Sequence, residues 1–189
     1  MVEEEVIWQH FREGDRQAFA RLYERYFPIL YGYGFRLSGD EEVVKDAIQT
    51  LFVELWKSRA GLSATSSVKF YLFRVLRRKI HEQTRRVTLA LPEDYHLEFD
   101  YSPETDLIQR ERLSLRREKL EQALRQLHPR QKEALSLLYL EGLSYPEIAG
   151  IMDIKVRTVY NLVHTALQVL RTTMPAALRL LALLSLHRW

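Results

Sequence analysis

Apolar side chains recur every three or four residues along much of the chain, the spacing typical of amphipathic helices. Residues 6–33 are rich in apolar and aromatic side chains at this spacing, and residues 40–58 carry a second broad stripe. Glu41 and Glu42 fall at the start of the second stripe, where acidic side chains stabilise a helix N-terminus. A third helix is predicted over residues 68–86. Its expected inward positions are Phe70, Phe73, Leu76 and Ile80.

Proline and glycine mark the predicted ends of these helices. Pro28 is expected to interrupt or kink the first helix, because proline has no amide hydrogen to donate. The Ser38-Gly39-Asp40 run predicts a helix end at Gly39 and a new N-cap at Asp40. Residues 61–67 are small and form a predicted loop.

The second half of the chain begins with a stretch that has no helical period. Residues 88–102 are acidic and are predicted to be a linker with little intrinsic order. A helix is then expected over residues 102–127. His128-Pro129 should end it, before another helix over residues 130–141.

Residues 142–160 have the layout of a short helix, a tight turn and a longer helix. Ser144 and Glu147 have the spacing of a capping box at the start of the short helix. Asp153 falls at the turn, where a residue must tolerate left-handed geometry. This layout predicts a helix-turn-helix, whose second helix enters the DNA major groove. The alternative is an ordinary surface helix in a helical hairpin.

The longer helix of this motif presents polar side chains outward. Arginine, lysine, asparagine and glutamine in such positions donate to phosphates or to base edges. The outward positions are Lys155, Arg157, Thr158, Asn161, His164, Thr165, Gln168 and Arg171.

The chain shows no strand-length alternation and no internal repeat. We therefore predict an all-α protein with two small helical domains joined by an acidic linker, the C-terminal one a helix-turn-helix. The predicted limits are residues 1–86 for the first domain, 87–110 for the linker, 111–174 for the second domain and 175–189 for an apolar tail.

Charge is unevenly distributed although the net charge is only +3. Residues 69–86 contain seven basic side chains and one acid, Glu82, whereas residues 87–109 contain six acids and no lysine or arginine. This segregation predicts a face that binds a polyanion, followed by an anionic connector. The helix at 68–86 also mixes aromatic with basic residues, a combination that suits unpaired bases. Alternatively, Phe70 and Phe73 belong to the core, which leaves Tyr71 as the better candidate for exposure.

Several function classes are disfavoured by composition. There is no cysteine, so disulfides and thiolate metal sites are excluded. The six histidines show no metal-ligand spacing, and the chain has neither a glycine-rich phosphate loop nor a nucleophile motif. We therefore expect no catalytic residues, no metal, no cofactor and no small-molecule substrate. The acidic N-terminus is unlike a signal peptide, and the apolar tail is too short to span a bilayer, so a cytoplasmic location is the default.

The order of these features resembles bacterial RNA polymerase sigma factors of the extracytoplasmic function (ECF) group, over residues 8–172. The family pattern Asp-x-x-Gln, then Phe and Leu-Trp, is matched by Asp46, Gln49, Phe52, Leu55 and Trp56. The pattern Trp-Leu-Phe-x-Ile-Ala-Arg-Asn is matched loosely by residues 71–78. The Leu-Pro, Tyr-Ser-x-Glu-Ile-Ala, Thr-Val and Ala-Leu-x-x-Leu-Arg patterns are matched at residues 127–129, 143–149, 158–159 and 166–171.

The resemblance implies a role for each region. The first domain would dock on the clamp coiled coil of the largest polymerase subunit through Asp46, Gln49, Glu54 and Trp56. The segment 60–86 would open and hold the −10 element, with the loop at 61–67 near a flipped base. Its implied DNA contacts are Lys69, Tyr71, Arg74, Arg77, Arg78 and Arg85. The recognition helix would read the −35 element through Lys155, Arg157, Thr158, Asn161, His164 and Arg171.

The implied partners are core RNA polymerase, promoter DNA and, for many members of such a family, an anti-sigma factor. The acidic linker would thread toward the RNA path of the enzyme. A stand-alone helix-turn-helix regulator is the alternative function, but it leaves the first domain without a purpose. The tail is expected to pack as a final helix on the second domain or to self-associate, rather than to bind a membrane or a partner.

This sequence departs from the family pattern at several positions. Tyr71 replaces the usual tryptophan, and Arg78 replaces an asparagine. Lys155 stands where a serine often caps the recognition helix, and Tyr160 and Thr165 stand where basic residues are common. We therefore expect a recognition helix with lower affinity for phosphate, which depends more strongly on polymerase.

Overall fold

The computed structural model describes residues 2–65, 67–87 and 122–173. Every regular element within these residues is a helix, which confirms the predicted all-α class. The chain divides into two compact units, Met1–His96 and Leu97–Trp189. The predicted linker and tail, and most of the helix expected over residues 102–127, lie outside the described residues. The predicted domain limits therefore stay predictions.

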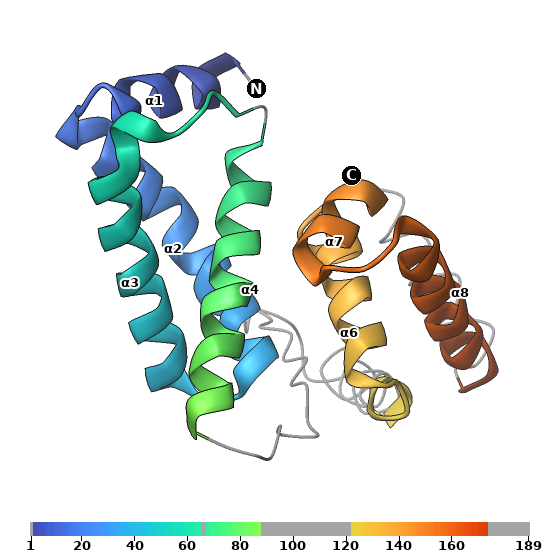
Figure 1. The fold of residues 1–189 in the computed structure, drawn as a ribbon. Helices are drawn as coiled ribbons and strands as arrows, with labels where there is room; N and C mark the ends of the chain where they lie inside the picture. Colours follow the sequence, from blue (N-terminus) through green and yellow to red (C-terminus); the bar gives the residue numbers. More distant parts are fainter. Residues whose placement is uncertain (1, 66, 88–121, 174–189) are drawn as a thin grey trace, which may run out of the picture. The chain divides into compact units, whose positions relative to one another are not determined.

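The described part of the first unit contains four α-helices, which Figure 1 labels. They are α1 (Val2–Arg12), α2 (Arg16–Ser38), α3 (Glu41–Ser58) and α4 (Val68–Val87), with the short 3-10 turn η1 (Arg59–Gly61) after α3. Helices α2, α3 and α4 pack against one another, and α1 lies across the end of the unit where α3 finishes.

The ends of these helices are fixed by local capping. The Asp15 carboxylate accepts the amides of Gln17 and Ala18 at the start of α2. Gly39 adopts left-handed geometry (φ 68°), and the Asp40 carboxylate caps α3. The predicted stop and restart at Ser38-Gly39-Asp40 is therefore confirmed.

The predicted interruption at Pro28 is wrong, because α2 continues through it. Pro28 itself is exposed, whereas Leu22, Tyr26 and Leu30 on the opposite face are almost completely buried. A proline inside a helix costs roughly 3 kcal/mol. Burial of a large apolar side chain contributes about 1.5–3 kcal/mol, so the three buried side chains together outweigh that cost.

The core of the first unit lies between α2, α3 and α4. Leu51, Leu72, Leu76 and Ile80 are at most 1% exposed. Gly34 allows the closest approach of α2, because a Cβ atom there would lie 2.8 Å from Val44 Cγ1 and 3.2 Å from Ile80 Cδ1. The fold therefore requires the smallest side chain at this position.

The second unit is built around a helix-turn-helix. Residues 122–125 are helical, and they are followed by α6 (Pro129–Leu135), the π-helical turn η2 (Ser136–Leu140), α7 (Tyr145–Met152) and α8 (Val156–Thr173). His128 caps α6 as its Nδ1 accepts the Arg130 amide, so the predicted break at His128-Pro129 is confirmed. The predicted helix over residues 130–141 ends in the π-helical turn before Gly142.

Buried aliphatic side chains join the helices of the second unit. Ile148 on α7 and Val159, Val163 and Ala166 on α8 are at most 3% exposed. Helix α8 packs against both α6 and α7. The apolar side of α8 therefore belongs to the core of this unit.

Candidate functional site

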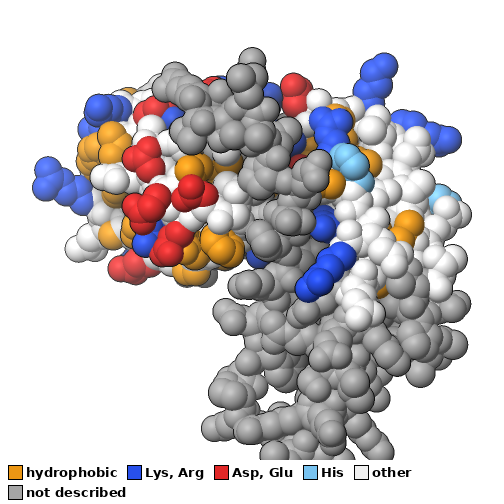
Figure 2. Space-filling view, turned by 90° about the horizontal axis from the view of Figure 1, so that it is seen from below, with side chains coloured by type: hydrophobic (Ala, Val, Ile, Leu, Met, Phe, Trp, Pro, Cys, Tyr) orange, Lys and Arg blue, Asp and Glu red, His pale blue; other side chains and the backbone are white. Residues whose placement is uncertain are grey.

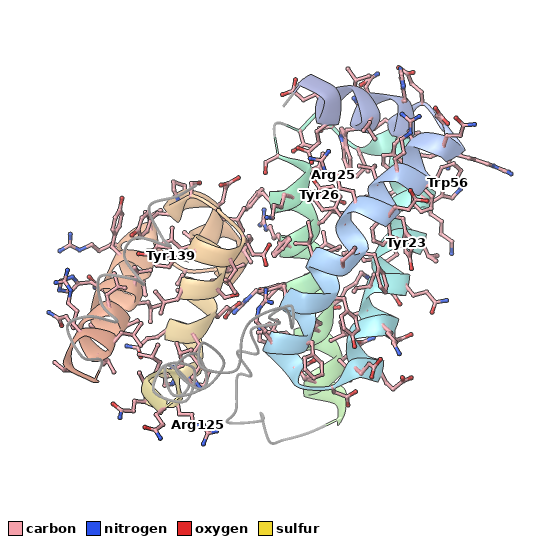
Figure 3. All side chains as sticks on the ribbon, turned by 180° about the vertical axis from the view of Figure 1, so that it is seen from behind. Tyr23, Arg25, Tyr26, Trp56, Arg125 and Tyr139 are labelled. Atoms are coloured by element: carbon pink, nitrogen blue, oxygen red, sulfur yellow. The ribbon has the colours of Figure 1, made fainter. Side chains whose placement is uncertain are left out.

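An apolar groove runs along the first unit between α2 and α3. Its volume is about 620 Å³. Its walls carry aromatic side chains in contact with one another, with ring centroids 5.0 Å apart for Phe19–Trp56 and 4.9 Å apart for Tyr23–Phe52. Figure 3 labels Tyr23 and Trp56 toward the same edge of the unit. The groove is lined by Phe19, Tyr23, Phe27, Lys45, Gln49, Phe52, Val53, Trp56 and Lys57.

The four residues expected to contact polymerase fall on two sides of α3. Gln49 and Trp56 line the groove. Asp46 instead accepts a hydrogen bond from Gln83 Nε2 at 2.6 Å, and the Glu54 carboxylate is paired with Lys79 Nζ at 2.6 Å. Gln83 and Lys79 both belong to α4, so Asp46 and Glu54 lie on the side of α3 that faces α4. Only Gln49 and Trp56 of the four residues therefore line the groove.

Lys79 is buried, unlike the other basic side chains of α4 that the structure describes, which are Lys69, Arg74, Arg77 and Arg78. It is 8% exposed, whereas the paired Glu54 side chain is 56% exposed. A buried ammonium is costly unless it is paired and hydrogen-bonded. Glu54 therefore stabilises the packing of α3 against α4.

Charged side chains also mark the N-terminal end of α3. Lys45 Nζ lies 2.5 Å from the Glu41 carboxylate and 3.9 Å from that of Glu42. The hydrogen bond from Lys45 lowers the pKa of Glu41 and raises the pKa of Lys45. Seen from this end of the unit, Figure 2 shows acidic side chains gathered around hydrophobic ones. The charged side chains that line the groove are Lys45 and Lys57, and Lys45 is paired with Glu41.

The predicted DNA-binding side chains of α4 differ in exposure. Arg74 and Arg78 are exposed, and Arg78 Nε lies 3.7 Å from Glu82 Oε1. Lys69 and Arg77 are half-buried, and Lys69 Nζ lies 5.6 Å from the centroid of the Phe73 ring. The Arg85 side chain lies outside the described residues.

The aromatic residues of α4 differ in burial. Phe73 is fully buried, as expected for a core residue, and Phe70 is half-buried. Tyr71, the expected exposed aromatic, is also half-buried. Its ring meets the Trp8 ring edge-on at 5.7 Å between centroids, and burial raises the pKa of its hydroxyl. One face of Tyr71 is therefore fixed by α1.

The helix-turn-helix has the predicted local geometry. The Glu147 carboxylate accepts the amide of Ser144 at 2.8 Å, which confirms the capping box. Asp153 takes left-handed backbone geometry at the turn (φ 53°). The Lys155 carbonyl accepts the amides of Thr158 and Val159, with no side-chain cap from Lys155 itself.

The predicted −35 contacts share the outer surface of α8 and the turn before it. All six are exposed: Lys155, Arg157, Thr158, Asn161, His164 and Arg171. Thr165, also predicted to face outward, accepts a hydrogen bond from Gln131 Nε2 at 2.9 Å and so helps to hold α8 against α6.

Sequence reasoning missed two aromatic features. Tyr145 and Tyr160 stack with ring centroids 4.0 Å apart and planes 10° apart, although Tyr160 remains 51% exposed. The contribution of α2 to the groove was also missed. The four-residue spacing of Phe19, Tyr23 and Phe27 was the available signal, since such residues share one helix face.

Two more properties hold for the part of the chain that the structure describes, residues 2–65, 67–87 and 122–173. None of the helices in that part of the chain combines the length and apolar character needed to cross a membrane. Among the same residues, no three His, Cys, Asp or Glu side chains are grouped so that they could hold a metal ion.

Two family models match the chain in the order of its units. The Sigma-70 region 2 model matches residues 22–88, and the Sigma-70 region 4 model matches residues 117–170. Solved structures show the same fold. The complex of CnrH with the cytosolic domain of CnrY has a TM-score of 0.60 at 21% identity, covering 89% of this chain and 95% of that one. RpoE with the anti-sigma factor NepR from Bartonella quintana has a TM-score of 0.59 at 21% identity, with coverages of 82% and 95%.

Curated relatives of this chain include sigma factors of the ECF group. The ECF RNA polymerase sigma factor BldN of Streptomyces coelicolor is 27% identical over 86% of this chain and 62% of its own length. SigE of Mycolicibacterium smegmatis is 29% identical over 79% of this chain and 59% of its own length, and CarQ of Myxococcus xanthus is 28% identical over 77% and 83%. The chain therefore spans about three fifths of the length of the first two relatives. It belongs to the sigma-70 family of RNA polymerase sigma factors and, within it, to the ECF group.

Proposed function

We propose that this chain binds core RNA polymerase and directs promoter-specific initiation of transcription. The observation that carries the proposal is the presence of both sigma regions, in order, on one chain whose groove and recognition helix are each accessible. It acts as a non-catalytic subunit, in the cytoplasm, with no cofactor or small-molecule substrate. The alternative, a stand-alone helix-turn-helix regulator, accounts for neither the region 2 match nor the groove.

The groove between α2 and α3 is the proposed docking site for a helical element of polymerase. Aromatic rings that are only partly covered by their own chain suit burial against an amphipathic helix. In this proposal Gln49 and Trp56 contact polymerase from within the groove. Asp46 and Glu54 contact it from the side of α3 that faces α4. An anti-sigma factor is a further proposed partner, since RpoE of Bartonella quintana has been solved with one.

The proposed DNA contacts divide between the two units. Lys69, Tyr71, Arg74, Arg77, Arg78 and Arg85 on α4 hold the −10 element. Lys155, Arg157, Thr158, Asn161, His164 and Arg171 contact the −35 element. Exposed arginines beside aromatic rings suit melted strands, and the outer face of α8 suits the major groove of a duplex.

A reconstituted run-off assay tests the proposal. Core polymerase with the purified chain should initiate at defined start sites on a genomic library, and core alone should not. Gln49→Ala should lower the affinity for core without changing the fold, and Glu42→Ala is the matched control on the exposed surface of α3. Tight, sequence-specific duplex binding without any core-dependent initiation would instead establish the stand-alone regulator.

A further inference from the structure

Helix α1 holds the start of the loop between α3 and α4, whose described residues are 62–65 and 67, by two hydrogen bonds. Trp8 Nε1 donates to the Ser63 carbonyl at 3.2 Å, and Arg12 Nε donates to the Leu62 carbonyl at 2.6 Å. The donors and acceptors are 50 or more residues apart in sequence. Figure 1 shows α1 lying beside this loop. The backbone at the start of the loop is therefore fixed by a distant helix.

The far end of the loop is fixed separately. The Thr65 hydroxyl donates to the Ser67 carbonyl and accepts the Ser67 amide, both at 3.2 Å. The Ser67 hydroxyl accepts the Phe70 amide and so starts α4. Between the two fixed ends, Ser63 and Ala64 remain exposed. The loop thus presents a short accessible stretch on a backbone whose position is already set.

Trp8 connects the loop to the nucleic-acid face of α4. Its side chain is only 2% exposed and is held between the Phe11 ring at 5.2 Å and the Tyr71 ring at 5.7 Å between centroids. The same indole therefore contacts the loop through its N–H and contacts Tyr71 through its ring. A substitution at Trp8 therefore alters contacts with both the loop and Tyr71, although Trp8 itself is too buried to touch DNA.

We propose that α1 sets base selection at the −10 element, with Trp8 and Arg12 as positioning residues that do not contact DNA. The inference rests on the proposed function and on the expectation, implied by the family resemblance, that the loop at 61–67 lies near an unpaired base. A loop that is ordered before binding avoids the entropic cost of ordering on the DNA. It also presents one geometry to the base, so that a wrong base cannot be accommodated by a shift of the backbone.

Trp8→Phe removes the donor to Ser63, and Arg12→Met removes the donor to Leu62 together with the exposed bond from Arg12 Nη1 to Gln9 Oε1 within α1. Trp8→Phe keeps an aromatic ring between Phe11 and Tyr71, and Arg12→Met keeps the aliphatic stem of Arg12. His10→Ala is the matched control, because His10 is exposed on the same helix. Each full-length variant would be combined with core polymerase on a promoter library randomised in turn at the −10 and −35 elements, and transcript counts would give the base preferences.

Each donor variant should reduce discrimination at the −10 element by about fivefold, the usual net worth of one hydrogen bond. Preferences at the −35 element, the affinity for core and the behaviour of His10→Ala should match the unaltered chain. An equal loss on every template, whatever its −10 sequence, would overturn the inference, because a purely structural role predicts that result. Unchanged −10 preferences in two folded variants would also overturn it. Failure of the unaltered chain to initiate on any template would overturn the proposed function, and this inference with it.

Discussion

The pairing of Glu54 with Lys79 predicts that Glu54 contributes to the stability of the first unit. In Glu54→Ala the Lys79 ammonium, 8% exposed, loses the carboxylate that lies 2.6 Å from it. Loss of a hydrogen bond to a charged group costs about 1.5–3 kcal/mol, and breaking a fully buried ion pair costs about 3–5 kcal/mol. Because Glu54 is more than half exposed, we expect a loss at the lower end, about 2 kcal/mol in the free energy of unfolding.

Urea denaturation followed by tryptophan fluorescence measures this loss, and a double-mutant cycle assigns it. Lys79→Met in the Glu54→Ala background removes the stranded charge, so it should recover much of the lost stability. Asp46→Ala is the control, because the Asp46 carboxylate that accepts the bond from Gln83 Nε2 is exposed, and its loss should cost below about 0.5 kcal/mol. If Glu54→Ala is as stable as the unaltered chain, or if Lys79→Met adds to its damage, the reasoning is refuted.

Three further predictions concern packing, backbone geometry and DNA binding. Gly34→Ala should destabilise the first unit by about 1–3 kcal/mol, because its Cβ would lie 2.8 Å from Val44 Cγ1; Val44→Ala should relieve part of the loss in chemical denaturation. Gly142→Ala should lower the free energy of unfolding by about 1 kcal/mol through its φ of +65° alone, since nothing lies within 4 Å of the added Cβ. Gly61→Ala is equally open but has no positive φ, so it should lack that cost in the same measurement. Equal losses in the two variants would contradict this reasoning. Arg157→Ala should weaken polymerase-dependent binding to −35 DNA, and it should reduce the slope of log affinity against log salt concentration by about 1 if the side chain contacts a phosphate. Arg125→Ala makes the same change of charge before α6 and should have neither effect. Titrations at several salt concentrations measure both.

Local signals in the sequence predicted the helix ends well. Gly39 with Asp40, His128 with Pro129, and Ser144 with Glu147 each act within four residues, so their hydrogen bonds depend little on the rest of the fold. The expected interruption of the helix at Pro28 failed for the opposite reason. Its effect depends on how much α2 buries on its other face, and that burial comes from helices far along the chain.

The sequence predicted which residues belong to the candidate site, but it did not predict on which side of α3 each of them lies. Helical spacing identifies α3 as a contact helix, yet it does not say which neighbour each polar side chain meets. Glu54 pairs with a lysine 25 residues away, and Asp46 pairs with a glutamine 37 residues away. Lys79 looks like the other basic residues of its segment, and its burial follows only from the packing of α3 on α4. Whether the assigned residues contact polymerase and DNA stays a prediction.

The positions of the tryptophans allow intrinsic fluorescence to report on two sites of the first unit. Of three tryptophans in the sequence, Trp56 lines the groove, with the Arg59 guanidinium 4.4 Å from its ring centroid, and Trp8 donates to the loop between α3 and α4. The described part of the second unit contains none. In a variant that also replaces Trp189, emission from Trp56 would follow occupation of the groove, and emission from Trp8 would follow strain in the loop. Singly substituted versions would then time polymerase docking and promoter opening as separate events, without an attached dye.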